Sequence, residues 1–393
     1  MKKIIVTIAF VLVIIQLNLY YFGQNVAEYF DLASFWRLNF TTWSIFCTSC
    51  DYNSQSKIQQ QPAIILMWTR YFDKEINGNY ILSAACPQTL CNITHDRRFL
   101  TQADAVVFHD RDFTLADFPY FRLVKQRYVY LNNESPYNSG KHLLNLDYFF
   151  NWTMTYRSDS DIQTSYGRIV TDSKLTVSMR EWEQRVMEQN TNLHNVILNK
   201  TLPLVWFASN CHTASGREQL IDSLKPYILV DIYGNCGSLN CSVASNKMCN
   251  HIIESRYWFY FAAENSNCRE YVTEKIWSRL HLWSVPIVLK RWMYDDILPR
   301  HSFIAASDFH SGRHLANYLH YLTRNATEYA KYFHWRFTLP QRTAQAPENI
   351  LTVGFCRLCE MLHETLPNKT YDDISNWWHT KAYCEHEFPF IDI

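Results

Sequence analysis

Short, continuously apolar segments recur along the chain and predict buried strands. Residues 62–68 (PAIILMW), 103–108 (ADAVVF) and 127–131 (RYVYL) have this character. A strand that is covered on both faces shows a continuous apolar run and not an alternating one. Polar, helix-compatible stretches separate the runs. Strands that alternate with helices favour a parallel sheet covered on both faces, so the folded part is predicted to begin with one α/β unit.

The same pattern restarts after Lys200. It predicts strands at 202–208, 228–233, 258–262 and 285–289, and helices at 216–224 and 273–283. Two successive α/β units predict two Rossmann-like domains, with the binding site in a cleft beyond the carboxyl ends of their strands. The predicted boundaries are 62–200 for the first domain, 201–345 for the second, and 346–393 for a cysteine-containing tail that ties the halves together.

The N-terminal segment 4–22 is an apolar run just long enough to span a bilayer as a helix. Because Lys2 and Lys3 precede it, residues 1–3 are expected to be cytoplasmic and the bulk of the chain lumenal. A signal peptide cleaved near Val26-Ala27 is the alternative. Residues 23–61 lack periodicity and are predicted to form a stem.

Composition narrows the class of protein. The 37 basic and 37 acidic residues give a formal net charge of zero, which argues against a nucleic-acid partner. A hydrophobic content of 48% and an aromatic content of 16% exclude a disordered chain. The length of 393 residues allows two or three domains.

Cysteines and glycosylation motifs indicate a secretory compartment. The twelve cysteines form an even set, as disulfides require. Cys47-x-x-Cys50 and Cys356-x-x-Cys359 also fit a zinc site or a redox pair, but structural disulfides are favoured in an oxidising lumen. The candidate glycosylation sites are Asn39, Asn92, Asn151, Asn199, Asn240, Asn325 and Asn368. A further tripeptide at Asn133 precedes a proline that disfavours its use.

The segment 257–290 holds the densest set of chemically informative residues. A helix is predicted to begin near Thr273, with Glu274 and Lys275 in its first turn. A helix N-terminus with a lysine suits a diphosphate, although a solvated amphipathic helix is the simpler interpretation. Arg217, at the start of the earlier predicted helix, could reach the same phosphates, or could be an ordinary surface arginine.

Carboxylates supply candidates for proton transfer and for metal binding. Glu134 follows the strand 127–131, where a general base would stand beside the cleft, although a turn glutamate looks the same in sequence. The pairs 159/161 and 110/112 have the Asp-x-Asp spacing of some metal-dependent sugar-nucleotide enzymes. Two separate matches to so short a pattern show how little it discriminates.

Taken in order, these stretches resemble the α-1,3-fucosyltransferases of glycosyltransferase family 10. The resemblance covers nearly the whole chain from Pro62 and includes the anchor and the stem. It is carried by Cys91-x-Ile-Thr-x-Asp-Arg, Gln102-Ala-Asp, Glu134-Ser-Pro, Tyr156-Arg-Ser-Asp-Ser-Asp-Ile-Gln, Tyr166-Gly, Ser209-Asn-Cys with Arg217, Phe261-Ala-Ala-Glu-Asn-Ser, Tyr271-Val-Thr-Glu-Lys, Val285-Pro-Ile-Val-Leu, Ser302-Phe-Ile, Asp308-Phe and Cys356-x-x-Cys.

The resemblance implies a GT-B architecture and an inverting transfer of L-fucose from GDP-fucose to GlcNAc of a glycoprotein glycan or another glycoconjugate. It implies that Glu134 is the general base and that Arg217 and Lys275 contact the diphosphate. It assigns the remaining donor contacts to Ser209, Asn210, Tyr166, Tyr260, Glu264, Asn265, Tyr271, Val272 and Glu274. No metal is strictly required, although Mn²⁺ or Mg²⁺ can stimulate such enzymes.

The resemblance also implies that Cys86 and Cys91 bridge to Cys356 and Cys359, and that the protein is a type II Golgi membrane protein. Homo-oligomerisation stays open. The sequence departs from the family pattern at Ala263, Trp283-Ser284, Lys290, Ser165 and Asn138. These departures concern acceptor preference and donor packing, and they leave the proposed base and phosphate contacts in place.

Two other functions stay open. One is a metal-dependent glycosyltransferase with a single Rossmann domain, an Asp-x-Asp pair and another sugar nucleotide. The other is an inactive, membrane-anchored glycan-binding homologue. Retention of Glu134, Arg217 and Lys275 together argues against the inactive homologue.

Overall fold

The computed structural model describes residues 61–386, apart from 79–80, 83–85, 87–89, 141–142, 172–177, 242–245, 337–341 and 346–348. These residues belong to one compact unit, Gln60–Ile393. The expected anchor and nearly all of the stem, with Asn39, Cys47 and Cys50, lie outside the described residues. Along the described part of the chain, no helix is both long and apolar enough to cross a membrane.

Six strands from the first half of the chain build one sheet. They are β1 Ala63–Met67, β2 Cys91–Thr94, β3 Ala105–His109, β4 Arg127–Asn132, β5 Trp152–Thr155 and β6 Ile162–Gln163. All neighbours are parallel, in the order β2-β1-β3-β4-β5-β6. Every residue of β3 and β5 is buried, which is why β3 reads as a continuous apolar run. The three strands predicted in this half are present.

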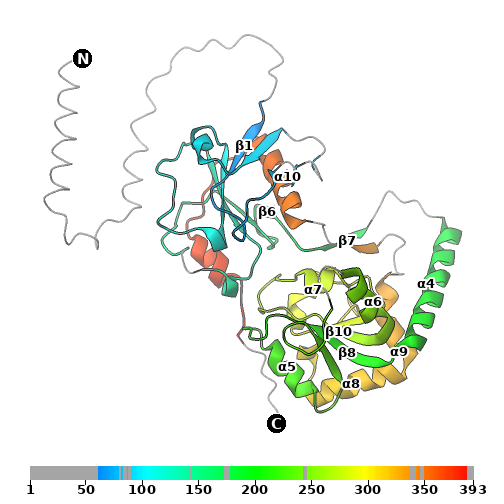
Figure 1. Ribbon diagram of the computed structural model, residues 1–393. Coiled ribbons are helices and arrows are strands. Elements are labelled where there is room, and N and C mark those ends of the chain that lie inside the picture. Colours follow the sequence, from blue (N-terminus) through cyan, green and yellow to red (C-terminus); the bar gives the residue numbers. More distant parts are fainter. Residues whose placement is uncertain are drawn as a thin grey trace, which may run out of the picture. The chain divides into compact units, whose positions relative to one another are not determined.

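A second parallel sheet is formed by the second half. Its strands are β8 Leu202–Phe207, β9 Val230–Tyr233, β10 Tyr257–Phe261, β11 Val285–Val288 and β12 Ile304–Ala305, in the order β12-β11-β10-β8-β9. The helices grouped with this sheet are α5 Arg217–Leu224, α6 Asn246–Arg256, α8 Gly312–Arg324 and α9 Ala326–Ala330 (Figure 1). Helix α8 buries Leu315, Leu319 and Leu322 on one face, the pattern of a helix that covers a core. This half is a Rossmann-like layered unit.

Further elements connect or cover the two sheets. They are β7 Arg168–Thr171, α4 Met179–Asn199, α7 Glu274–Trp277, β13 Arg342–Gln345, α10 Ile350–Leu362, the π-helix η8 Asn376–Thr380, and the 3-10 helices η1 Arg97–Thr101, η2 Asp110–Asp112, η3 Pro136–Asn138, η5 Arg291–Met293, η6 Ala306–Asp308 and η7 Lys331–Arg336. β7 pairs antiparallel with β13. α4 begins at a capping box between Ser178 and Glu181.

The interval between β3 and β4 differs from the predicted alternation of strands and helices. It contains η2 and loop, because Phe113 and Phe118 pack edge-on against Phe108 and Pro119 cannot donate a helical hydrogen bond. A helix from the C-terminal tail packs on this sheet instead. Helix α10 contributes Leu351, Phe355 and Leu358 to the same core as β1, β3, β4 and β5, and lies beside β1 in Figure 1.

The helix predicted over 273–283 is wrong in length, because α7 ends at Trp277. Beyond it the chain continues in tighter turns, with Leu282 N–H donating to the carbonyl of Arg279 (2.9 Å). The guanidinium of Arg336 donates hydrogen bonds to the carbonyls of Leu280 and Leu282, each at 2.6 Å. A distant arginine therefore satisfies two backbone carbonyls in this segment that a longer helix would have used.

Five disulfides join the described cysteines. Cys86–Cys356 and Cys91–Cys359 are the pairs that the family resemblance implies. The other three pairs, Cys211–Cys236, Cys241–Cys249 and Cys268–Cys384, were not assigned from the sequence. The zinc or redox alternative fails for the Cys356-x-x-Cys motif, because both sulfurs are in structural bridges. His363 lies beside one bridge, whose sulfurs have no thiolate to offer a metal.

Candidate active site

Glu134 lies just beyond the carboxyl end of β4 and is partly exposed. Its backbone N–H donates to Asn132 Oδ1 (2.8 Å), a local turn that orients the residue. Its Oε2 accepts a hydrogen bond from the hydroxyl of Tyr271 (3.3 Å), which belongs to the second half of the chain. The carboxylate therefore stands at the sheet edge where parallel α/β sheets bind ligands, and a residue of the other half contacts it.

Three tyrosines lie within the electrostatic reach of Glu134. Burial raises the pKa of Tyr271 well above its ordinary value, and the charge of Glu134 adds to the rise. The same two causes, in the same order, raise the pKa of Tyr166 and bring that of Tyr71 to about 12. The Tyr166 hydroxyl donates to the carbonyl of Asn133 (2.8 Å). All three phenols therefore stay protonated at neutral pH, and those of Tyr271 and Tyr166 act as hydrogen-bond donors.

Glu264 anchors the residues that precede and begin α7. The side chain is 1% exposed, and its carboxylate accepts from Thr273 N–H (2.7 Å) and from the Thr273 hydroxyl (2.8 Å). Lys275 Nζ forms an ion pair with the same carboxylate at 2.9 Å. Burial raises the pKa of Glu264, and the charge of Lys275 opposes this rise.

Lys275 is held in its charged form at this site. Burial alone would lower its pKa, but the negative charges of Glu264 and Glu274 outweigh burial and hold the pKa above its ordinary value. A quarter of its side chain remains exposed. Because α7 has only four residues, its dipole contributes little, and the positive potential here comes mainly from side chains.

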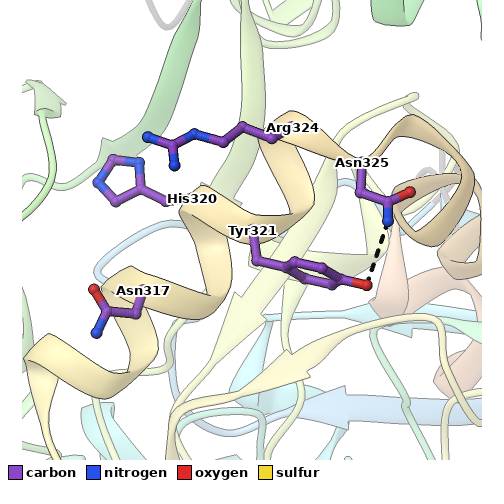
Figure 2. Close-up of a pocket in the computed structure, with 5 residues that line it drawn as sticks. All are labelled: Asn317, His320, Tyr321, Arg324 and Asn325. Atoms are coloured by element: carbon purple, nitrogen blue, oxygen red, sulfur yellow. Dashed lines mark hydrogen bonds between the residues drawn. The ribbon is translucent and has the colours of Figure 1, made fainter.

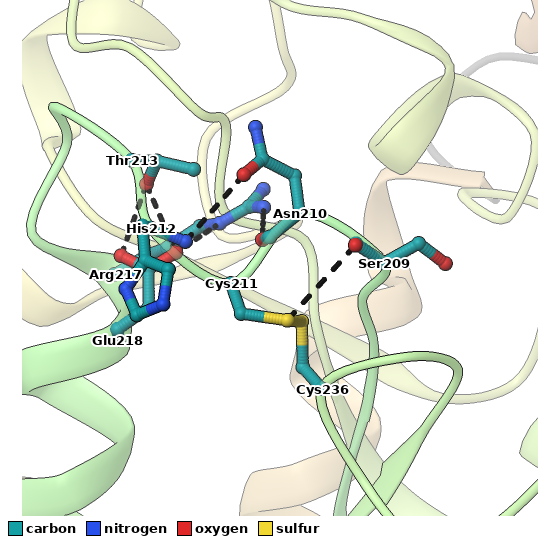
Figure 3. The surroundings of a disulfide bond; sticks show 8 residues. All are labelled: Ser209, Asn210, Cys211, His212, Thr213, Arg217, Glu218 and Cys236. Carbon is teal, nitrogen blue, oxygen red and sulfur yellow. Dashed lines mark hydrogen bonds and ion pairs between the residues drawn. A yellow bond between two sulfur atoms is a disulfide. The ribbon is translucent and has the colours of Figure 1, made fainter.

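Arg217 is 3% exposed at the start of α5, so the surface-arginine alternative is wrong. Its guanidinium donates to the carbonyls of Asn210 (2.6 Å) and Ala263 (3.2 Å) and to Glu218 (3.2 Å). Figure 3 shows how the guanidinium lies beneath the loop that follows β8. Its positive charge acts to lower the pKa of Lys275, which places two cations near one another.

The other predicted donor contacts divide into two groups. Ser209 and Asn210 are exposed just beyond β8. Asn265 Oδ1 is buried and has no hydrogen-bond partner in the described part of the chain, so a bound ligand could satisfy it. Tyr260 is 1% and Val272 3% exposed, and both belong to the hydrophobic core. Both side chains are enclosed by protein, and the Tyr260 hydroxyl, like Asn265 Oδ1, has no hydrogen-bond partner among the described residues.

The Asp-x-Asp pairs already have protein partners. Asp159 pairs with Arg157 (2.5 Å) and Arg269 (2.9 Å). Asp161 accepts from the hydroxyl of Tyr371 (2.9 Å) and from Lys369. In the other pair, the hydroxyl of Tyr130 donates to Asp110 (2.9 Å), and His109 contacts Asp112 at 2.5 Å. These carboxylates organise loops of the first half.

The candidate glycosylation sites are not equivalent. Asn92, Asn199, Asn240 and Asn368 are exposed, and Asn325 is partly exposed. Asn151 is the exception, because it is 2% exposed and its amide nitrogen donates to the carbonyl of Lys369 (2.8 Å). A glycan cannot be accommodated at Asn151 in this folded structure.

A hollow of about 470 Å³ lies apart from these residues. It is lined by one face of α8 and its end, as Figure 2 shows, with Asn317, His320, Tyr321, Arg324 and Asn325. Asn325 Nδ2 donates there to the hydroxyl of Tyr321 (3.3 Å). None of the predicted catalytic or donor residues lines this hollow.

Several residues at the site escaped the sequence analysis. One of them is Tyr71, which follows β1 and lies near Glu134. Another feature that was not predicted is the hydrogen bond between the hydroxyls of Ser135 and Ser266 (2.7 Å). No local pattern marks a hydroxyl pair separated by more than a hundred positions. The ends of parallel strands were the only usable signal, since β1 and β4 end at the same sheet edge.

Comparison with known proteins gives a consistent result. Residues 60–167 match the model described as "Fucosyltransferase, N-terminal", and residues 197–377 match "Glycosyltransferase family 10 (fucosyltransferase) C-term". An alpha-(1,3)-fucosyltransferase C of Drosophila melanogaster is 34% identical over 344 residues, covering 81% of this chain and 78% of that protein. A 4-galactosyl-N-acetylglucosaminide 3-alpha-L-fucosyltransferase of Pan troglodytes is 37% identical over 309 residues, covering 77% and 79%.

Among solved structures, an alpha1,3-fucosyltransferase crystallised with GDP-fucose aligns with a TM-score of 0.49 at 17% identity, covering 81% of this chain and 96% of that one. The family models span both halves of the chain, and the relatives extend over most of it. The chain therefore belongs to glycosyltransferase family 10, and is a fucosyltransferase of the α-1,3 family.

Proposed function

We propose that the protein transfers L-fucose from GDP-fucose to the 3-hydroxyl of a GlcNAc residue in a glycoconjugate, with inversion at the fucose anomeric carbon. One observation carries the proposal: the Tyr271 hydroxyl of the second half donates to the Glu134 carboxylate of the first half. The candidate base is thereby linked to the segment that supplies Glu264 and Lys275. The family membership and the acceptor in the name of the Pan troglodytes relative support the same reaction class.

In this proposal Glu134 takes the proton of the acceptor hydroxyl as its oxygen attacks the anomeric carbon. The bond from that carbon to the diphosphate breaks, and GDP departs with the electron pair. Lys275 and Arg217 compensate the negative charge that develops on the leaving diphosphate. Because both cations are fixed by hydrogen bonds before substrate arrives, they need little reorganisation during the reaction.

The proposal assigns no obligatory step to a metal ion, and stimulation by Mn²⁺ or Mg²⁺ is left to experiment. Activity that persists in EDTA, with GDP-fucose as the only productive donor, is the expected outcome. Loss of all activity in EDTA, or efficient use of another sugar nucleotide, would favour the metal-dependent alternative. Binding of GDP without any turnover on any acceptor would favour the inactive homologue.

Glu134→Gln in the full-length chain tests the base directly. Transfer is expected to fall by about 10²–10⁴-fold, the usual contribution of general-base catalysis, with GDP affinity retained. Glu328→Gln on the surface of α9 is the matched control, since its pair with Lys331 is exposed and contributes little. Wild-type turnover in Glu134→Gln would remove this residue from the base role.

We further propose that the enzyme works in the Golgi lumen behind a type II anchor at residues 4–22. Five disulfides among the described residues support an oxidising compartment. Protease treatment of sealed microsomes is expected to spare residues 62–386. Digestion of this part without detergent would contradict the proposed orientation.

A further inference from the structure

The C-terminal segment 377–386, which we call the strap, is packed against loops of the first sheet. Trp378 is fully buried, and its indole N–H donates to Ser139 Oγ (2.8 Å). Its ring lies 5.5 Å from that of Tyr130. Further along, the hydroxyl of Tyr137 donates to the carbonyl of Cys384 (3.1 Å). The strap therefore contacts the loop that directly follows Glu134.

The strap is also fixed to the loop 262–273, which we call the donor loop. The disulfide Cys268–Cys384 joins them covalently. The backbone N–H of Arg269 donates to the carbonyl of Ala382, and the N–H of Glu385 donates to the carbonyl of Asn267, both at 2.8 Å. Lys290 forms an ion pair with Glu385 at 2.9 Å.

The donor loop is the part of the second half that touches the base. Tyr271 donates to Glu134 at 3.3 Å, and Ser266 pairs with Ser135 at 2.7 Å. The carboxylate of Glu270 accepts from the hydroxyl of Ser158 (2.8 Å), and Glu270 itself has a φ of +61°, which a side chain rarely adopts. A non-glycine residue keeps this backbone conformation only where the surroundings impose it.

We propose that the strap is a positioning element for fucosyl transfer, acting on the donor loop through Cys268–Cys384 and Lys290–Glu385. It holds the donor loop against Glu134, so that the base and Lys275, which follows the loop, keep their mutual placement. The inference rests on the proposed function. Its physical basis is that the donor loop lacks helix or strand structure of its own and therefore depends on outside contacts. A misplacement of the reacting groups by about 1 Å can cost a factor of about 10² in rate.

The test compares two double variants of the full-length chain. Cys268→Ala/Cys384→Ala frees the strap, and Cys241→Ala/Cys249→Ala removes a disulfide elsewhere in the second half. Turnover is counted per GDP-binding site, so that unfolded protein does not contribute. Freeing the strap is expected to lower turnover per site by about 10–100-fold, while the control keeps it within about twofold. GDP affinity should change little in either variant.

A charge exchange covers the case in which the disulfide variant fails to fold. Lys290→Glu is expected to lower turnover per site about fivefold, and Lys290→Glu/Glu385→Lys to restore it, because an ion pair of this exposure contributes up to about 1 kcal/mol. Unchanged turnover per site after freeing the strap, or an equal loss in the Cys241/Cys249 control, would overturn the proposal. So would a failure of the charge exchange to restore activity.

Hydrogen exchange separates this inference from the proposed function. Peptides that span 262–273 should exchange faster in Cys268→Ala/Cys384→Ala than in the wild type, whether or not any acceptor is turned over. If the wild type transfers no fucose but the donor loop is released in the variant, the proposed function fails and the strap contact stands. If exchange is unchanged in the donor loop, the strap does not position it.

Discussion

Replacing Lys275 with methionine isolates the buried charge of Glu264. Methionine keeps most of the volume of the side chain but leaves a carboxylate that is 1% exposed without its ion-pair partner at 2.9 Å. Removing one partner of a buried pair costs about 3–5 kcal/mol of unfolding free energy. Glu264 keeps the hydrogen bonds from Thr273, and Lys275 is a quarter exposed, so a loss below this range is expected, about 2–3 kcal/mol.

A double variant supplies the matched control. Glu264→Gln/Lys275→Met removes the uncompensated charge, so it should recover about 1–2 kcal/mol relative to Lys275→Met alone. Urea unfolding of the full-length chain measures both values. Titration calorimetry with GDP should show affinity reduced about 10–100-fold in both variants, since each loses the charge-assisted phosphate contact that we propose for Lys275, which would contribute about 1.5–3 kcal/mol.

The pH dependence provides a further check. Burial already raises the pKa of Glu264, and loss of Lys275 removes a charge that opposes this rise. A carboxyl with a raised pKa in the folded state binds more protons folded than unfolded, so unfolding free energy falls as pH rises. Lys275→Met should therefore lose more stability at pH 8 than at pH 5. The reasoning would be refuted if the wild type and Lys275→Met were equally stable at pH 8. It would also be refuted if the losses of unfolding free energy in Glu264→Gln and in Lys275→Met simply added in the double variant.

Two further predictions concern packing and protonation. A Cβ at Gly167 would lie 2.2 Å from the Trp277 ring. Gly167→Ala should therefore lower the unfolding free energy measured by urea titration by about 1–3 kcal/mol. Unchanged stability would mean that this contact is not tight. Burial lowers the pKa of Lys200 to about 7. Above that pH the unfolded chain therefore binds a proton at Lys200 that the folded chain has lost. Unfolding free energy should consequently rise by about 1–2 kcal/mol between pH 7.5 and 9. Lys200→Met should abolish this rise, and an equal slope in both proteins would contradict the assignment.

The sequence by itself determined the two sheets and the general place of the site. A run such as 103–108 is almost entirely apolar, which favours a strand buried on both faces, and β3 is such a strand. Once parallel sheets are predicted, polar residues that follow their strands must gather at one edge. Glu134 after β4 was proposed in this way. The resemblance to family 10 then implied two of the disulfides that the structure contains, and it assigned the diphosphate contacts to Arg217 and Lys275.

Only the tertiary structure decided how these parts are held together. Glu134 and Tyr271 are 137 positions apart, and Cys268 and Cys384 are 116 apart, so no local pattern encodes either contact. The early end of α7 likewise depends on Arg336, and the burial of Asn151 depends on the tail around Lys369. Local sequence sets which segments are apolar and where they end. The hydrogen-bond partner of a buried polar group is instead set by the distant segment that the fold brings close to it.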